Sequence, residues 1–245
     1  MSMLTERQIQ LLRAIIDSYI NDAEPVGSVE VVKRHNLKFS AATVRNEMAQ
    51  LFHMGFLDMP HTSSGRVPTK LAYRLYLEQL MEEVELPVLQ EVALKQRLWP
   101  TRFQHERMLR EAAVALAEIT KMLSIVTTKD GFVTYAGAVN VLDNKEFWEI
   151  DTAKAALMLL DDYVLLEKVF QNAPYGNDIK CMIEEELGMD SLKKCTLVFT
   201  EYGGTGANSK SGYIALLGPS RMNYANVIPA VRYTKRLIEE LNEAW

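Results

Sequence analysis

The chain has 245 residues, 48% of them hydrophobic and 24% charged, with a formal net charge of −5. This length allows two domains, and this composition is typical of a folded globular protein, which argues against disorder. The longest apolar runs are interrupted by Asp161, Asp162 and Glu167 before they reach the roughly 18 residues of a membrane helix. Because the N-terminus also lacks a secretory signal pattern, a cytoplasmic protein with no membrane partner is expected.

The basic residues are concentrated in one segment. Between Lys33 and Tyr76 there are seven basic and two acidic residues, a local charge of +5, so the rest of the chain carries −10. Contact with nucleic acid requires only a local basic segment, because affinity depends on the phosphates that are touched. Self-repulsion elsewhere aids solubility and suppresses indiscriminate binding.

Two helices are predicted before residue 37. The first covers residues 5–22, with Thr5 as its N-cap, and Pro25 and Gly27 break the chain after it. Ser28 is expected to cap a short second helix. Helical spacing predicts a buried stripe in the first helix, formed by Ile9, Leu12, Ile15, Ile16 and Tyr19.

A third helix is predicted from Ser40, its N-cap, to the residues before Gly55. Its apolar residues follow the spacing i, i+4, i+7, i+8, which is typical of a helix with one buried face. The apolar stripe consists of Val44, Met48, Leu51 and Phe52, and the outer faces carry Ala41, Thr43, Arg45, Asn46 and Gln50.

A two-stranded hairpin and a fourth helix complete the first domain. Residues 56–60 and 67–69 predict short strands, joined by the turn HTSSGR at 61–66, and Thr69 is expected to cap a helix that runs to residue 86. Three helices followed by a hairpin are the order of a winged helix-turn-helix domain, expected over residues 1–86.

Residues 87–124 are expected to form a helical linker with a break around Pro100. From residue 105 to 123, apolar residues alternate spacings of three and four, which is typical of a coiled-coil seam. The sequence leaves two interpretations open: part of a dimer interface, or a helix packed on its own domain. The seam consists of Leu109, Ala112, Leu116, Ile119 and Leu123.

The remainder, residues 125–245, predicts a sheet with covering helices. Strands are expected at 124–128, 132–139, 179–184, 196–202 and 211–218, and helices at 151–160, 163–170 and 222–244. Pro229 is expected in the first turn of the last helix, where its missing N–H costs nothing. The two cysteines, Cys181 and Cys195, have no Cys-x-x-Cys pair or neighbouring histidine, so buried free thiols are expected instead of a metal site.

The third helix carries side chains that can read base edges. Arginine pairs with both acceptors of guanine, asparagine pairs with adenine, and threonine contacts a thymine methyl or a phosphate. Arg45, Asn46 and Thr43 are therefore candidate DNA contacts, although a solvated helix face has similar residues. Gln50 on the same helix and Lys70 beside the hairpin are further candidates, with Lys70 expected on a phosphate. The hairpin turn adds His61, Thr62, Ser63, Ser64, Gly65 and Arg66.

The sequence gives little support for an enzymatic function. GTGANSKS at 204–211 resembles a phosphate-binding loop, but Ser209 stands where that motif needs glycine, and the segment lies between two predicted strands. The four histidines are scattered, so no metal or nucleophile cluster is visible. A non-enzymatic protein without a cofactor is expected.

Seven segments together resemble the HrcA family of heat-inducible transcription repressors. Five lie in the first domain, where EPVGS, ATVRNEM and PHTSSGRVPT are the most specific, and two lie in the second. The segments are LTERQIQLLRAIIDSYI, EPVGS, SAATVRNEMAQL, GFLDMPHTSSGRVPT, YRLYLEQLM, AGAVNVLDNKEFWEI and GYIALLGPSRMNYANVI.

The resemblance implies a homodimeric repressor at the bacterial nucleoid that binds an inverted-repeat operator in double-stranded DNA, called CIRCE, upstream of chaperone genes. It also implies coupling to the chaperonin GroEL. By matching position, DNA contacts would come from Ser40, Thr43, Arg45 and Asn46 and from residues 61–66. The fold class implied is α+β, an N-terminal winged helix-turn-helix domain plus a reduced GAF-like α/β domain.

This sequence departs from the family between TTKD and GFVTYAG, where further strands and a dimerisation insert are absent. A shortened second domain leaves an alternative function open: a sensor or chaperone-interaction protein whose winged helix has lost operator binding.

Overall fold

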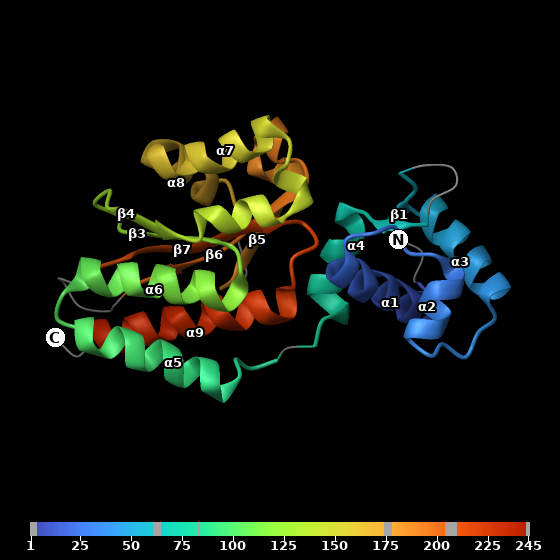
Figure 1. Cartoon of the computed structure of the whole chain (residues 1–245), viewed down its shortest axis with the longest axis horizontal. Coiled ribbons are helices and arrows are strands. Elements are labelled where there is room, and N and C mark those ends of the chain that lie inside the picture. Colours follow the sequence, from blue (N-terminus) through green and yellow to red (C-terminus); the bar gives the residue numbers. More distant parts are fainter. Residues whose placement is uncertain (1–3, 61–64, 83, 174–177, 204–209, 244–245) are drawn as a thin grey trace. The chain divides into compact units, whose positions relative to one another are not determined.

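The computed structural model describes residues 4–60, 65–82, 84–173, 178–203 and 210–243. The chain divides into two compact units, Met1–Glu82 and Glu83–Trp245 (Figure 1). Residues 87–124, expected as a linker, belong to the second unit. No helix in the described ranges is long and apolar enough to cross a membrane.

The first unit has the predicted order of elements. Its helices and strands are α1 (Glu6–Asp22), α2 (Ser28–Arg34), α3 (Ala41–His53), β1 (Leu57–Asp58), β2 (Val67–Pro68) and α4 (Lys70–Leu75), followed by a π-helical turn, Tyr76–Leu80. Strands β1 and β2 pair antiparallel, with Leu57 opposite Pro68. The winged helix-turn-helix arrangement is therefore confirmed.

Helix caps set most of these boundaries. Thr5 forms a capping box with Gln8, the Ser40 side chain accepts a hydrogen bond from the Thr43 amide, and Thr69 caps α4 through the Ala72 amide. Each hydroxyl satisfies an amide that the first helical turn leaves unpaired, which explains why these three predictions are confirmed.

Two predictions in the first unit are wrong. Ser28 does not cap α2 but is its first residue, because Gly27 holds the extended cap conformation and its carbonyl accepts the Val31 amide at 3.0 Å. The fourth helix does not reach residue 86. It widens into the π-helical turn and ends at Met81, whose backbone is extended.

The second unit contains a five-stranded antiparallel sheet in the order β4-β3-β7-β6-β5. Its helices are α5 (Val88–Leu98), α6 (His105–Thr120), α7 (Ile150–Asp161), α8 (Tyr163–Gln171) and α9 (Tyr224–Glu243). Its strands are β3 (Leu123–Thr127), β4 (Val133–Ala136), β5 (Lys180–Ile183), β6 (Cys195–Tyr202) and β7 (Gly212–Pro219). The expected sheet with covering helices is confirmed, and with it the α+β fold class.

The sheet separates two helical layers (Figure 1). Helices α7 and α8 lie over one face, where Leu159, Leu166 and Phe170 pack with apolar side chains of β3, β6 and β7. Helices α6 and α9 cover the other face, and α5 packs against α6 and α9 on the side away from the sheet. The second unit therefore has α5 as an additional outer layer.

The coiled-coil seam predicted in α6 is part of the core of the second unit. Leu109, Ala112 and Leu116 have no exposed surface, because α6 packs against β3, β4 and α9 of its own unit. Leu123 is equally buried but lies in β3, since Lys121 ends α6 in the left-handed conformation at φ 57°. Ile119 is half-buried. Of the two interpretations left open, the helix packed on its own domain is correct.

The last helix carries its predicted stripe but not its predicted proline position. The stripe is buried throughout: Val227, Val231, Thr234, Ile238 and Leu241. Pro229, however, lies inside α9, past the first turn. Its missing N–H therefore leaves the Ala225 carbonyl without its helical donor. Of the cysteines, both are free, Cys195 buried and Cys181 only half-buried.

Candidate nucleic-acid interface

Helix α3 presents one outward face that combines polar and small side chains. At 100° per residue, Ala42, Arg45, Asn46, Ala49 and His53 lie on the same side of the helix. Arg45, Asn46 and His53 are exposed. Neither Arg45 nor Asn46 makes a hydrogen bond to another part of the chain that the structure describes. The two alanines add little bulk beside Arg45 and Asn46, so these two side chains can reach into a groove.

His53 is a candidate contact that the sequence reasoning missed. It is exposed in the last turn of α3, with its ring at 5.7 Å from that of Phe52 in an edge-to-face arrangement. The sequence could have indicated His53, because it follows Asn46 by seven residues and Arg45 by eight and therefore lies on the same face of the helix.

The opposite side of α3 is fixed to the domain. Val44, Met48 and Leu51 are buried, and the Glu47 carboxylate, also buried, forms an ion pair with Arg7 of α1. Gln50 accepts a hydrogen bond from Gln8 Nε2 at 2.9 Å. This hydrogen bond engages the Gln50 side-chain oxygen with α1, while Gln50 itself remains exposed.

Ser40 and Thr43 organise the start of α3. Ser40 Oγ lies 3.1 Å from the Thr43 amide and 2.9 Å from Thr43 Oγ1. Both hydroxyls are thus engaged in the cap, and they fix the first turn whose next residues are Arg45 and Asn46.

The wing turn is described only at its base. His61, Thr62, Ser63 and Ser64 lie outside the described residues. Arg66 pairs with Val26 through two backbone hydrogen bonds of 2.9 Å, which joins the EPVGS segment to the hairpin. The Arg66 guanidinium lies 5.5 Å from the centre of the Phe52 ring. Arg66, half-buried, therefore holds the base of the wing against α3.

Replacing Gly65 with alanine should displace the wing base. A Cβ at this position would lie 2.4 Å from the Val26 carbonyl oxygen, far inside van der Waals contact, and the neighbouring atoms are backbone. We expect the free energy of unfolding to fall by about 1–3 kcal/mol, the cost of overpacking. Chemical denaturation measures this.

Gly27→Ala provides the matched control, because no atom lies within 4 Å of a Cβ there. Gly27 is the N-cap of α2, where glycine is preferred over alanine, so its replacement should cost about 0.5–1 kcal/mol without any steric clash. Equal losses for the two variants would contradict the close approach of Gly65 to Val26.

Lys70 lies next to the wing base as the first residue of α4, half-buried and directly after the Thr69 cap. Thr69 Oγ1 also donates to the Gly55 carbonyl at 2.7 Å, which ties α4 to the end of α3. The candidate contacts that the structure describes thus all lie in the winged-helix unit. Residues 61–64 lie outside the described residues.

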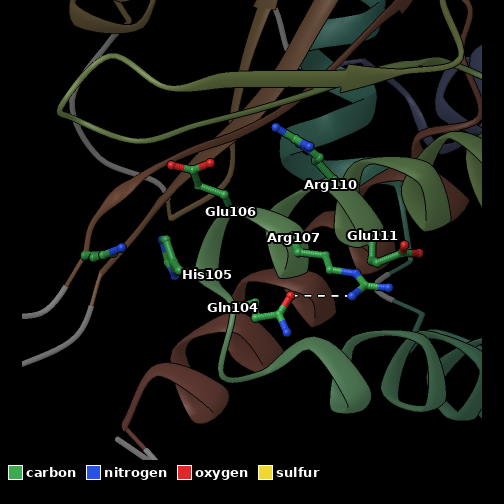
Figure 2. A pocket seen from close by; sticks show the side chains of 7 residues that line it. Gln104, His105, Glu106, Arg107, Arg110 and Glu111 are labelled. Carbon is green, nitrogen blue, oxygen red and sulfur yellow. Dashed lines mark hydrogen bonds between the residues drawn. The ribbon is translucent and has the colours of Figure 1, made fainter.

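The second unit has an open hollow at the start of α6, but its side chains do not converge (Figure 2). Arg107 donates to Gln104 at 3.4 Å, whereas Arg110 points away from both. Burial and nearby Lys210 lower the pKa of His105, whose ring is not aimed at a common point with the arginines. The hollow mixes acids and bases, so it has no charge preference.

The glycine-rich segment at 204–211 connects two strands, as the sequence predicted. It joins β6 and β7, which are paired antiparallel, instead of a strand and a helix. Residues 204–209 themselves lie outside the described part of the chain. Among the described residues, no group of histidine, cysteine and acidic side chains could hold a metal ion.

Comparison with known families agrees with the two-unit structure. Residues 3–82 match the family described as winged helix-turn-helix transcription repressor, HrcA DNA-binding, and residues 73–228 match the HrcA protein C terminal domain. The chain belongs to the HrcA family. HrcA proteins are transcription repressors and not enzymes, so the predicted DNA-binding domain and the absence of catalysis are both confirmed.

Individual HrcA relatives match over nearly the whole chain or over about half of it. The heat-inducible transcription repressor HrcA of Acetivibrio thermocellus is 27% identical, with 97% of this chain and 96% of the relative covered. HrcA of Shouchella clausii is 46% identical over 51% of this chain and 36% of the relative. The first alignment spans 338 positions, so the relative has segments with no counterpart among these 245 residues.

One solved structure shares the fold. A crystal structure described as that of a hypothetical protein superimposes with a TM-score of 0.77, at 18% identity and with 99% of each chain covered. At this identity, the likeness supports the fold alone.

Proposed function

We propose that this HrcA protein represses heat-shock genes, binding an inverted-repeat CIRCE-type operator as a homodimer in the cytoplasm, and that the GroEL chaperonin modulates it. The outward face of α3 carries the proposal. Arg45 and Asn46 are exposed there between two alanines, and the rest of the helix is anchored by Val44 and Met48. Arginine and asparagine are the side chains with bidentate partners on guanine and adenine.

The dimer follows from the form of the operator. An inverted repeat presents two equal half-sites, and helix-turn-helix dimers bind half-sites about one helical turn, roughly 34 Å, apart. One copy of α3 reads one half-site. Two copies related by two-fold symmetry therefore match the symmetry of the DNA.

Footprinting on the promoter of the organism's own chaperonin operon tests the function. The protein is titrated with and without purified chaperonin across a temperature ramp. We expect a protected inverted repeat that weakens with heat and is restored by chaperonin. Chaperonin binding without any sequence preference on DNA would instead support the alternative, a chaperone-interaction protein with a degenerate winged helix.

Replacing Lys70 with alanine should weaken binding to all DNA sequences equally. Removing one phosphate contact lowers the slope of log affinity against log salt concentration by about 0.9. Fluorescence anisotropy on operator and scrambled DNA, at several salt concentrations, measures both quantities.

Lys154→Ala is the control for Lys70→Ala, because Lys154 is an exposed lysine of α7 and its loss changes the net charge by the same amount. It should leave the slope unchanged. A Lys70→Ala effect confined to operator DNA would argue for a base contact instead of a phosphate contact.

A further inference from the structure

The turn between α2 and α3 is fixed at both of its ends. The Leu37 amide donates to the Val32 carbonyl at 3.1 Å, and Asn36 reverses the chain in the left-handed conformation at φ 48°. At the other end, Ser40 caps α3. Leu37 and Phe39 are both half-buried, so the turn is held against its own unit.

Lys38 projects from this turn into solvent. Its neighbour Phe39 lies under the Arg7 guanidinium, 5.9 Å from the centre of the ring, whereas Lys38 itself is exposed. Among the residues that the structure describes, none forms a hydrogen bond or an ion pair with Lys38. An ammonium group is therefore presented three residues before the start of α3, free to bind an anion.

The surface around Lys38 carries only positive charge. Between residues 31 and 56 the one acid is Glu47, which is buried in an ion pair with α1. Lys33, Lys38 and Arg45 are exposed in the same stretch. Every exposed charged side chain there is basic, and such a surface attracts a polyanion.

Lys38 and Lys70 lie at opposite ends of α3. Lys38 precedes its N-terminus, and Lys70 follows Thr69, whose hydroxyl donates to the Gly55 carbonyl just past the C-terminus at 2.7 Å. The 13 residues of α3 span about 20 Å, at about 1.5 Å per residue. The major groove is about 12 Å wide, so a helix of this length lying across it reaches the phosphates at both edges.

We propose that Lys38 binds a backbone phosphate at one edge of the major groove while Lys70 binds a phosphate at the other edge, so that α3 lies across the groove and is held at both ends. The proposal deepens the proposed function, since it rests on α3 entering the groove. Arg45 and Asn46 lie between the two lysines along the helix, where they meet base edges. Lys38 has no base preference of its own, but it fixes where α3 sits.

The salt dependence of DNA affinity tests the contact of Lys38. In anisotropy titrations of the full chain on scrambled DNA, Lys38→Ala should lower the slope of log affinity against log salt concentration by about 0.9, the value for one phosphate. Lys38→Arg keeps the charge and should keep the slope. An unchanged slope in Lys38→Ala would overturn the proposal.

Arg34→Ala is the matched control, because it lies four residues before Lys38 and changes the net charge by the same amount. Arg34 is also exposed, but it forms an ion pair with Asp22 of α1. Its loss should therefore leave the slope unchanged. An equal fall in the two variants would mean that the slope follows net charge instead of a contact, which would overturn the proposal.

Combining Lys38→Ala with Lys70→Ala tests the arrangement at the two ends of α3. Two separate phosphates predict that the slope falls by about 1.8. On operator DNA with single neutral methylphosphonates, the effect of each variant should vanish at a different position, one on each strand. A combined fall of only about 0.9, or one methylphosphonate that abolishes both effects, would overturn the arrangement.

Scrambled DNA separates this proposal from the proposed function, because no operator is needed for the slope. A wild type that binds operator no better than scrambled DNA, together with the expected fall in Lys38→Ala, would disprove sequence-specific repression and support the phosphate contact. A clear operator preference with an unchanged slope in Lys38→Ala would support the function and overturn the contact.

Discussion

Replacing Arg45 with alanine should weaken operator binding by about 1–3 kcal/mol, roughly 5- to 150-fold, and relax the base preference at one position of each half-site. Arg45 is exposed on the outward face of α3, so the loss should leave the melting temperature unchanged. Anisotropy titration on operator variants, paired with a thermal melt, measures both.

The physical reason is the geometry of the guanidinium. Its fork places two donors against the two acceptors of guanine in the major groove, and no other base offers that pair. When the side chain is removed, every base at this position becomes equivalent. Affinity for the best sequence therefore falls more than affinity for the others.

Asn46→Ala provides an internal comparison. Asn46 lies beside Arg45 on the same face, and its amide matches adenine, so the two losses should affect different positions of the half-site. Lys154→Ala controls for net charge. If Arg45→Ala leaves both affinity and base preference unchanged, then α3 does not read the operator through this residue.

Local signals in the sequence predicted the first unit well. Hydroxyl caps at Thr5, Ser40 and Thr69 and the glycine at Gly55 act within one helical turn, so their effect can be read from neighbouring residues. The Ser28 error has the same origin. Glycine at position 27 adopts the cap conformation itself, and the more familiar capping residue follows it.

Packing partners were not predictable in the same way. The spacing in α6 showed correctly that Leu109, Ala112 and Leu116 are buried, but a stripe does not reveal what covers it. The sheet of the same unit covers it, through contacts distant in sequence.

Helix α3 shows the same limit most clearly at Glu47. By composition it counts as one of two acids in a basic segment, yet its side chain is buried and paired with Arg7, 40 residues away. Gln50 likewise binds Gln8. Glu47 and Gln50 both contact α1, and only a structure could show that the buried Glu47 does not face outward, whereas Gln50 remains exposed.

Replacing Arg7 with alanine should therefore destabilise the first unit by about 1–3 kcal/mol. Removing one partner of a fully buried ion pair costs roughly 3–5 kcal/mol, because the other charge stays buried without compensation. Arg7 is 47% exposed, so water already screens part of the interaction and the expected value is lower. Chemical denaturation followed by a probe in the first unit measures the loss.

Arg13→Ala is the matched control on the same helix. Arg13 is similarly exposed at 42%, but its partner Glu82, at 3.0 Å, is 75% exposed. Such a surface pair contributes less than about 1 kcal/mol. Equal losses of unfolding free energy in the two variants would show that the burial of Glu47 does not increase the contribution of its ion pair to stability.

A second substitution identifies the cause of the loss. If the buried charge is responsible, Glu47→Gln in the Arg7→Ala background should recover part of the stability, because a neutral amide costs less to bury than a carboxylate. If lost packing of Arg7 is responsible, the double variant should be no more stable than Arg7→Ala. Recovery together with weaker operator binding would link the buried pair to the orientation of α3, since Glu47 lies one position from Asn46 and contacts no DNA in the proposed function.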